Sequence, residues 1–191
     1  MTTRFDFVAK AATPSMRKAF FGVDDDIEPG MVPKLQKLAQ AMVKPTRGFR
    51  SPDLAAVSTA RHLDGAVQVV DVLRDLDFGR WTGKSLAEIV ATDPAGLSLW
   101  LNEPAAAPHG GETLEDLRRR VGAWLDTEAG QPGRVLAICS ANAIRAALLH
   151  CLDIPTETFM RFDLRPASLT RLSFNAGQWR LQELSAPHDG D

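Results

Sequence analysis

Short apolar runs of strand length are followed repeatedly by longer segments of helical periodicity, and this alternation limits the folds open to the chain. The clearest case is residues 134–139, typical of a buried strand, which residues 141–152 follow at once with helical patterning. Residues 4–9 and 68–73 are further strand-like runs, and residues 31–42 form an amphipathic helical segment. Strands that alternate with helices usually pair in parallel. The sequence therefore predicts an α/β fold, a three-layer α/β/α sandwich with a mostly parallel central sheet.

Local signals mark where further helices begin. Ser51 and Pro52 are typical of a helix start, with the serine as cap, and they predict a helix that runs through His62. A capping box begins at Ser85, and a looser one at Thr113 opens another helix. Each signal places a side-chain oxygen where the first backbone N–H groups of a helix need an acceptor.

The second half of the chain contains a long irregular segment and a terminal hairpin. Residues 76–112 combine several prolines with glycine pairs and are interpreted as a loop and helical insertion over one edge of the sheet. Residues 168–174 and 178–184 predict the hairpin, and the polar residues 186–191 predict a frayed tail. We expect a single domain over residues 1–191.

Acidic and basic residues nearly balance in this chain. Lys and Arg number 22 and Asp and Glu number 24, for a net charge of −2, which argues against a dedicated nucleic-acid binder. The apolar runs fall well short of the roughly 20 residues of a membrane span, and the first residues lack a signal-peptide core. We therefore expect a cytoplasmic protein with no nucleic-acid or membrane partner. Cys139 and Cys151 form neither a disulfide framework nor a zinc site, and no metal or cofactor is expected.

Polar side chains follow three of the strand-like runs. Lys10 follows the first run, Asp75 follows residues 68–73, and Ser140 follows residues 134–139. Ligands of α/β sheets gather beyond the carboxyl ends of the strands. Ser140 also precedes a helix, whose first backbone N–H groups can hold an anion. These three side chains are therefore the first candidates for a site.

Three segments occur in an order that is similar to one protein family. They are residues 75–83 (Asp-Leu-Asp-Phe-Gly-Arg-Trp-Thr-Gly), residues 110–113 (Gly-Gly-Glu-Thr) and residues 135–146 (Val-Leu-Ala-Ile-Cys-Ser-Ala-Asn-Ala-Ile-Arg-Ala). The ordered set resembles the histidine phosphatase superfamily, also called phosphoglycerate mutase-like, and within it the compact branch that includes α-ribazole phosphatase. The resemblance runs from about Arg4 to Leu184 and implies the phosphoglycerate mutase-like fold.

The resemblance also implies a set of site residues. In the superfamily, the histidine of a first-strand Arg-His-Gly motif takes up the phosphoryl group, two arginines grip it, a second histidine follows a later strand, and an acid protonates the leaving group. The matching positions of this chain hold other residue types, with the acid as the exception. They are Ala9 and Ala55 for the arginines, Lys10 for the nucleophilic histidine, Ser140 for the second histidine and Asp75 for the acid.

These replacements predict that the phosphohistidine chemistry is lost. No histidine occurs before His62, so no register of the first strand supplies an imidazole. Losing a nucleophile that acts within a catalytic unit costs on the order of a million-fold in rate. Lys10 is an ammonium group at neutral pH, so it can attract an anion but is a poor nucleophile.

We therefore expect a non-catalytic member of the superfamily that binds a small phosphorylated or carboxylate ligand, or a protein partner. Two alternatives stay open. One is a phosphomonoesterase or mutase, similar to α-ribazole phosphatase, with an unusual active site; the other is a different hydrolase built on Ser140 or Asp75. No oligomeric state is predicted. The expected ligand-binding residues are Ala9, Lys10, Thr13, Ala55, Asp75 and Ser140.

A few other groups are candidates for the same pocket. His109 precedes a glycine pair in the insertion and could act as a base, although a position on a surface loop is the stronger expectation. His62 and His150 are expected to be structural or partly exposed, and His188 lies in the tail. The basic run over residues 118–120 is interpreted as a solvated helix face. Candidate replacements for the missing arginines are Arg47, Arg50, Arg80, Lys84 and Arg145.

Overall fold

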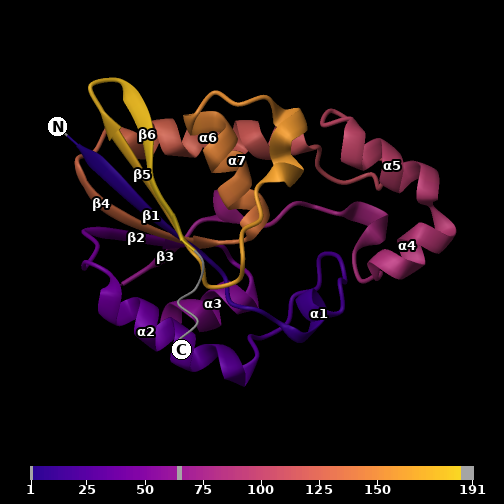
Figure 1. Ribbon diagram of the computed structural model, residues 1–191, viewed down its shortest axis with the longest axis horizontal. Helices are drawn as coiled ribbons and strands as arrows, with labels where there is room; N and C mark the ends of the chain where they lie inside the picture. Colours follow the sequence, from indigo (N-terminus) through magenta and orange to yellow (C-terminus); the bar gives the residue numbers. More distant parts are fainter. Residues whose placement is uncertain (1, 64–65, 186–191) are drawn as a thin grey trace.

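A six-stranded sheet forms the centre of the protein (Figure 1), whose computed structural model describes residues 2–63 and 66–185. The strand order is β3-β2-β4-β1-β5-β6. The first four of these strands are parallel to one another, and the β5–β6 hairpin is antiparallel, so the expected mostly parallel sheet is confirmed. The strands are β1 (Thr3–Ala9), β2 (Arg47–Arg50), β3 (Gln68–Val69), β4 (Gly133–Cys139), β5 (Leu169–Asn175) and β6 (Gln178–Ser185).

Helices cover both faces of this sheet, which confirms the three-layer sandwich. Figure 1 shows α2 (Val32–Ala41) and α3 (Leu54–Arg61) on one face, and α6 (Leu114–Ala129) and α7 (Ala141–Cys151) on the other. Two further helices, α4 and α5, lie beside the sheet, away from the hairpin. Their bounds, with those of α1 and the 3-10 turns, are α1 (Pro14–Arg17), α4 (Leu86–Thr92), α5 (Pro94–Asn102), Pro29–Met31, Asp71–Leu73, Gly79–Trp81 and Thr156–Arg161.

The alternation of side chains along β1 divides the core between the two faces. Phe5 and Phe7 pack with the buried residues of α6 and α7, while Val8 packs on the other face with residues of α2 and α3. All three side chains are fully buried. Successive side chains of a strand point to opposite faces of the sheet, so the sequence of β1 determines which of its residues pack on each face.

The helix after β2 starts later than the sequence suggests. We expected Ser51 to cap a helix that opens at Pro52, but α3 begins at Leu54 and the side chain of Asp53 accepts from Ala56 N. The backbone at Ser51 still belongs to the sheet edge, because Ser51 N donates to Ile138 O at 2.9 Å. The strand predicted over residues 68–73 is also shorter, since a 3-10 turn begins at Asp71.

The remaining boundaries follow the predictions. The 134–152 strand and helix, the capping box at Ser85 and the terminal hairpin are confirmed. The predicted frayed tail over residues 186–191 lies outside the described residues. Within the part of the chain that the structure describes, no helix is long and apolar enough to cross a bilayer.

Two backbone segments of the 76–112 region meet at glycines. A Cβ built on Gly111 would lie 2.1 Å from Asp77 O, and one built on Gly79 would lie 2.3 Å from His109 O. The contact also holds backbone hydrogen bonds, including Glu112 N to Asp77 O at 2.9 Å. Only glycine fits this approach, and the contact fixes the segment that follows Asp75.

The substitution Gly111→Ala should therefore lower the free energy of unfolding by about 3 kcal/mol, because the new methyl group overlaps the backbone of Asp77. Gly110→Ala is the matched control: Gly110 has φ +76° but open space around it, so only about 1 kcal/mol of left-handed strain is expected. Urea titration followed by tryptophan fluorescence measures both. Equal losses for the two variants would contradict the close approach.

Candidate functional site

The carboxyl ends of β1, β2 and β4 meet at one edge of the sheet. Lys10 N donates to Cys139 O at 2.8 Å, and Ser51 N donates to Ile138 O at 2.9 Å. This pairing places the residues that follow three strands side by side, as expected for the ligand edge of a parallel sheet. Lys10, Asp53 and Ser140 all lie within this cluster.

Lys10 is buried and carries a paired charge. Its Nζ lies 3.0 Å from Asp53 Oδ1 and 3.7 Å from Asp75 Oδ2, and the residue is only 7% exposed. Burial lowers the pKa of Lys10, but the charges of Asp75 and Asp53 outweigh burial and leave the pKa above its usual value. Lys10 is therefore an ammonium group at neutral pH, without the free electron pair that a nucleophile needs.

Asp53 links the lysine to the start of α3. Its Oδ1 accepts from Ala56 N at 3.1 Å, and its Oδ2 accepts from Ser51 Oγ at 2.5 Å. Burial raises the pKa of Asp53, but Lys10 and the Ser51 hydroxyl outweigh it and hold the pKa below its usual value. Asp53 is a site residue that no sequence pattern predicted. The available signal was its type, because aspartate is a preferred helix cap.

Asp75 begins a chain of hydrogen bonds that crosses to α7. Its Oδ1 accepts from Leu76 N at 2.8 Å and from Asn142 Nδ2 at 3.0 Å. The Asn142 Oδ1 in turn accepts from Arg145 Nη1 at 3.0 Å. Because Asp75 also lies 3.7 Å from Lys10, the two residues belong to one polar network. Asn142 is a second site residue that no sequence pattern predicted.

The other predicted site residues have structural contacts. Ser140 caps α7, with its Oγ accepting from Ala143 N at 3.2 Å, and Thr13 caps α1 in the same way. Both line the cavity described below. Ala9 and Ala55 are each 2% exposed and pack in the interior, and neither is among the cavity-lining residues.

A cavity of about 600 Å³ opens beside Lys10. A neighbouring cavity of about 280 Å³ shares Lys10 and Asp75 but adds the carboxylates of Asp24, Asp53 and Asp77. The larger cavity has an apolar wall and a polar end, whereas the smaller one is acidic. The polar and charged residues that line the larger cavity are Lys10, Thr13, Ser15, Asp75, Ser140, Asn142 and Arg145.

Of the candidate replacement arginines, Arg145 is the one that lines this cavity. Arg47 pairs with Glu128, Arg80 pairs with Asp93, and Arg50 Nη1 donates to Ser51 O at 3.0 Å. Lys84 is not among the lining residues of either cavity. The set proposed from the sequence is thus reduced to one cation at the site.

The prediction that His109 occupies a surface loop is wrong. Its ring is 1% exposed and packs against Trp81, Trp100 and Phe78, and its Nδ1 accepts from Gly111 N at 3.0 Å. Burial lowers the pKa of His109, so the ring is neutral at neutral pH. His109 is not among the residues that line the two cavities at Lys10.

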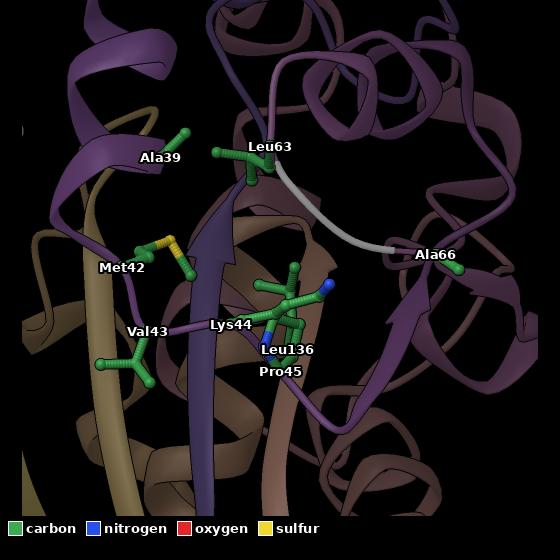
Figure 2. Close-up of a pocket in the computed structure, with 8 residues that line it drawn as sticks. All are labelled: Ala39, Met42, Val43, Lys44, Pro45, Leu63, Ala66 and Leu136. Carbon is green, nitrogen blue, oxygen red and sulfur yellow. The ribbon is translucent and has the colours of Figure 1, made fainter.

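A third cavity, of about 500 Å³, lies on the face covered by α2 and α3 (Figure 2). Its wall is apolar, with Met42, Leu63 and Leu136 among the lining side chains and Lys44 as the one charged lining residue. This lining set contains no carboxylate, imidazole, hydroxyl or thiol group, and its one amine, on Lys44, is exposed. The candidate site is therefore the sheet edge at Lys10.

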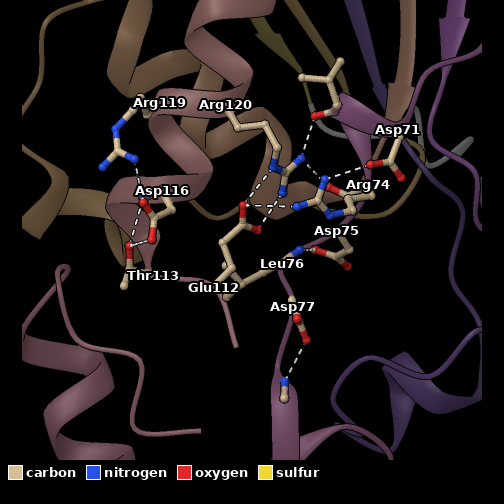
Figure 3. Close-up of polar contacts among 12 residues, drawn as sticks. Asp71, Arg74, Asp75, Leu76, Asp77, Glu112, Thr113, Asp116, Arg119 and Arg120 are labelled. Atoms are coloured by element: carbon tan, nitrogen blue, oxygen red, sulfur yellow. Dashed lines mark hydrogen bonds and ion pairs between the residues drawn. The ribbon is translucent and has the colours of Figure 1, made fainter. Parts of the chain in front are cut away.

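An ion pair between Arg120 on α6 and Glu112, just before that helix, supports the loop that carries Asp75 (Figure 3). Arg120 donates to both carboxylate oxygens of Glu112, at 2.8 and 2.6 Å, and its Nη1 also donates to Val72 O at 2.5 Å and to Arg74 O at 3.2 Å. The interpretation of residues 118–120 as a solvated face is therefore wrong for Arg120, because its guanidinium is directed inward to the loop. It is also wrong for Arg118, which donates to Thr156 Oγ1 and to Leu149 O, each at 3.1 Å.

The sequence model of the histidine phosphatase superfamily (branch 1) matches residues 33–187. The chain belongs to this superfamily. A curated relative, the bifunctional protein Rv2228c of Mycobacterium tuberculosis, is 36% identical over 123 residues, which are 63% of this chain and 34% of that protein. The chain thus spans about a third of the length of the curated relatives it matches.

Solved structures of several phosphatases share the fold of this chain. A phosphoserine phosphatase of Entamoeba histolytica, in complex with 3-phosphoglyceric acid, has a TM-score of 0.86 at 16% identity, covering 97% of this chain and 98% of its own. A mycobacterial glucosyl-3-phosphoglycerate phosphatase has a TM-score of 0.84 at 22% identity, covering 94% of this chain and 96% of its own. The α-ribazole phosphatase of Shigella flexneri has a TM-score of 0.84 at 17% identity, covering 98% of both chains. The resemblance to the α-ribazole phosphatase branch is confirmed at the level of the fold.

Proposed function

We propose that this histidine phosphatase domain binds a small ligand in the cavity beside Lys10 and does not transfer phosphoryl groups through a phosphohistidine. The observation that carries the proposal is the ion pair of Lys10 and Asp53, at 3.0 Å, in the position that the resemblance assigns to the nucleophile. An ammonium group held by two carboxylates has no electron pair to attack phosphorus. Asp75 then has no phosphoenzyme chemistry to assist.

The charges around Lys10 also weaken it as a phosphate site. Asp53 and Asp75 already neutralise its charge, and Asp24 and Asp77 line the adjoining cavity. A phosphate dianion placed there would meet four carboxylates, and like charges at such short range are unfavourable. The bidentate arginine contacts that favour phosphate would be absent at Ala9 and Ala55.

Turnover of an aryl phosphate tests this proposal directly. We expect the purified protein to hydrolyse p-nitrophenyl phosphate no faster than the buffer does, with a catalytically active superfamily member assayed beside it. The same result is expected for the variants Lys10→Gln and Asp75→Asn. If the native protein hydrolysed the substrate and either substitution abolished that hydrolysis, the result would contradict the proposal.

The second candidate is a phosphomonoesterase or mutase with an unusual active site. The comparisons favour it over the non-catalytic proposal, because the family is a phosphatase family and the three structural neighbours described are phosphatases. In this case Asp75 would act as the acid, and Asp75→Asn would lower turnover. A hydrolase built on Ser140 is less favoured, since the Ser140 hydroxyl oxygen already accepts from Ala143 N. A protein partner and a cytoplasmic location stay predictions.

A further inference from the structure

Arg145 differs from Lys10 in having no carboxylate at ion-pair distance among the described residues. Its Nε donates to Phe162 O at 2.8 Å, its Nη1 donates to Asn142 Oδ1, and the guanidinium lies 5.7 Å from the centre of the Phe159 ring. Among residues 2–63 and 66–185, no ion pair within 4.0 Å is found for this group. Of the two cations that line the cavity at the sheet edge, Lys10 is thus already paired with carboxylates, and Arg145 can still pair with an anionic ligand.

The surroundings of Arg145 favour an added anion. Burial lowers the pKa of Arg145, and the charges of Asp163 and Asp75 offset this effect only in part. Removing a charge from water is costly unless the charge is paired. A negatively charged group that approaches the guanidinium from the cavity would supply the missing partner.

The mouth of the same cavity is apolar. Five large apolar side chains, each 37–40% exposed, line it from three separate parts of the chain. Phe21, Phe78 and Trp100 continue the apolar wall inward. Apolar side chains that gather around a concave site are typical of a ligand pocket. The five residues of this rim are Met16, Phe20, Val23, Leu86 and Met160.

The charge of the cavity selects among anions. Two cations, Lys10 and Arg145, line the cavity, but Lys10 is already paired with Asp53 and Asp75, so Arg145 supplies the one positive charge left for a ligand. A monoanion matches this charge, whereas a dianion such as a phosphomonoester would also face the acidic cavity next to Lys10. A carboxylate is the monoanion that forms bidentate pairs with guanidinium groups.

We propose that the cavity binds an amphipathic carboxylate, with its head at Arg145 and its apolar body along the rim of Met16, Phe20 and Met160. The proposal rests on the proposed function, because it assigns a ligand class to the same pocket. It moves the anion from the nucleophile position at Lys10 to a cation on α7. Binding requires no covalent step.

Isothermal titration with octanoate, octylamine and inorganic phosphate tests the ligand class. Octanoate should bind the native protein, and octylamine and phosphate should each bind at least about 10-fold more weakly. Arg145→Gln should weaken octanoate binding about 10- to 100-fold, as expected for the loss of a charge-assisted contact. Arg119→Gln, which changes an exposed arginine of α6, should leave it unchanged.

A second variant keeps the test decisive if Arg145→Gln fails to fold. Phe20→Asp changes an exposed rim residue and should weaken octanoate binding by repulsion and by loss of apolar contact. Three results would each overturn the inference: no octanoate binding by the native protein, equal octanoate binding by the native protein and a folded Arg145→Gln or Phe20→Asp variant, or tighter binding of octylamine than of octanoate. Phosphatase turnover would instead overturn the proposed function, so the two failures are distinguishable.

Discussion

Replacing Glu112 with alanine should lower the free energy of unfolding by about 3–5 kcal/mol, the range expected when one partner of a nearly buried ion pair is removed. The side chains of Glu112 and Arg120 are 9% and 13% exposed, and two hydrogen bonds join them. The substitution leaves the guanidinium of Arg120 without its counter-charge against the loop that carries Asp75 (Figure 3). Urea titration followed by tryptophan fluorescence measures the change.

Arg119→Ala on the same helix is the control for this prediction. Arg119 pairs with Asp116, but the two side chains are 75% and 44% exposed, so the loss should be under about 1 kcal/mol. If the Glu112 and Arg119 variants lost equal stability, the Glu112–Arg120 pair would not support the loop as described.

Replacing Asp53 with alanine should cost about 3 kcal/mol. About 1 kcal/mol comes from the lost cap of α3, and the rest comes from Lys10, which keeps only the more distant Asp75 as a partner. For a chain of this length the loss corresponds to a fall in Tm of about 6–12 °C. Differential scanning calorimetry at neutral pH measures it.

The cost of Asp53→Ala should depend on pH in one direction. The pKa of Asp53 is below its usual value of 3.8 in the folded state, so its contribution is present above that pH and is lost as the pH falls through the folded pKa. The pKa of Lys10 is above its usual value of 10.5, so its contribution is lost only as the pH rises beyond that value. The difference between native and variant proteins should therefore be constant around neutrality and shrink in acid.

Ser85→Ala provides the comparison for the Asp53 variant. Ser85 caps α4 at a half-buried position, and its loss should cost about 1 kcal/mol. An Asp53 variant that is no less stable than the Ser85 variant would show that the contact between Lys10 and Asp53 contributes little.

The sheet and its helices could be predicted because they follow from local patterns. The apolar run of β4 and the helical periodicity of α7 are written in consecutive residues, and Phe5 and Phe7 alternate with polar neighbours as a strand requires. Asp53 is different, since its partner Lys10 is 43 positions away and only the closed sheet edge brings them together. Sequence spacing contains no sign of that contact.

The sequence also does not show which of several arginines lies at the candidate site. In the sequence, Arg47, Arg80 and Arg145 are equal candidates for an anion-binding cation. In the structure, Arg47 pairs with Glu128 and Arg80 pairs with Asp93. The burial of His109 likewise depends on tryptophans that reach it from other turns of the chain. Burial and ion pairing are properties of the packed chain, so they appear only when the fold is known.

The mass of the intact protein after exposure to a phosphoryl donor tests the central claim most directly. The protein is incubated with p-nitrophenyl phosphate and analysed at neutral pH, where a phosphohistidine would survive, and again after acid treatment. With Lys10 held as an ammonium group by Asp53, we expect the unmodified mass in both samples. A mass increase of one phosphoryl group that acid removes would contradict the account.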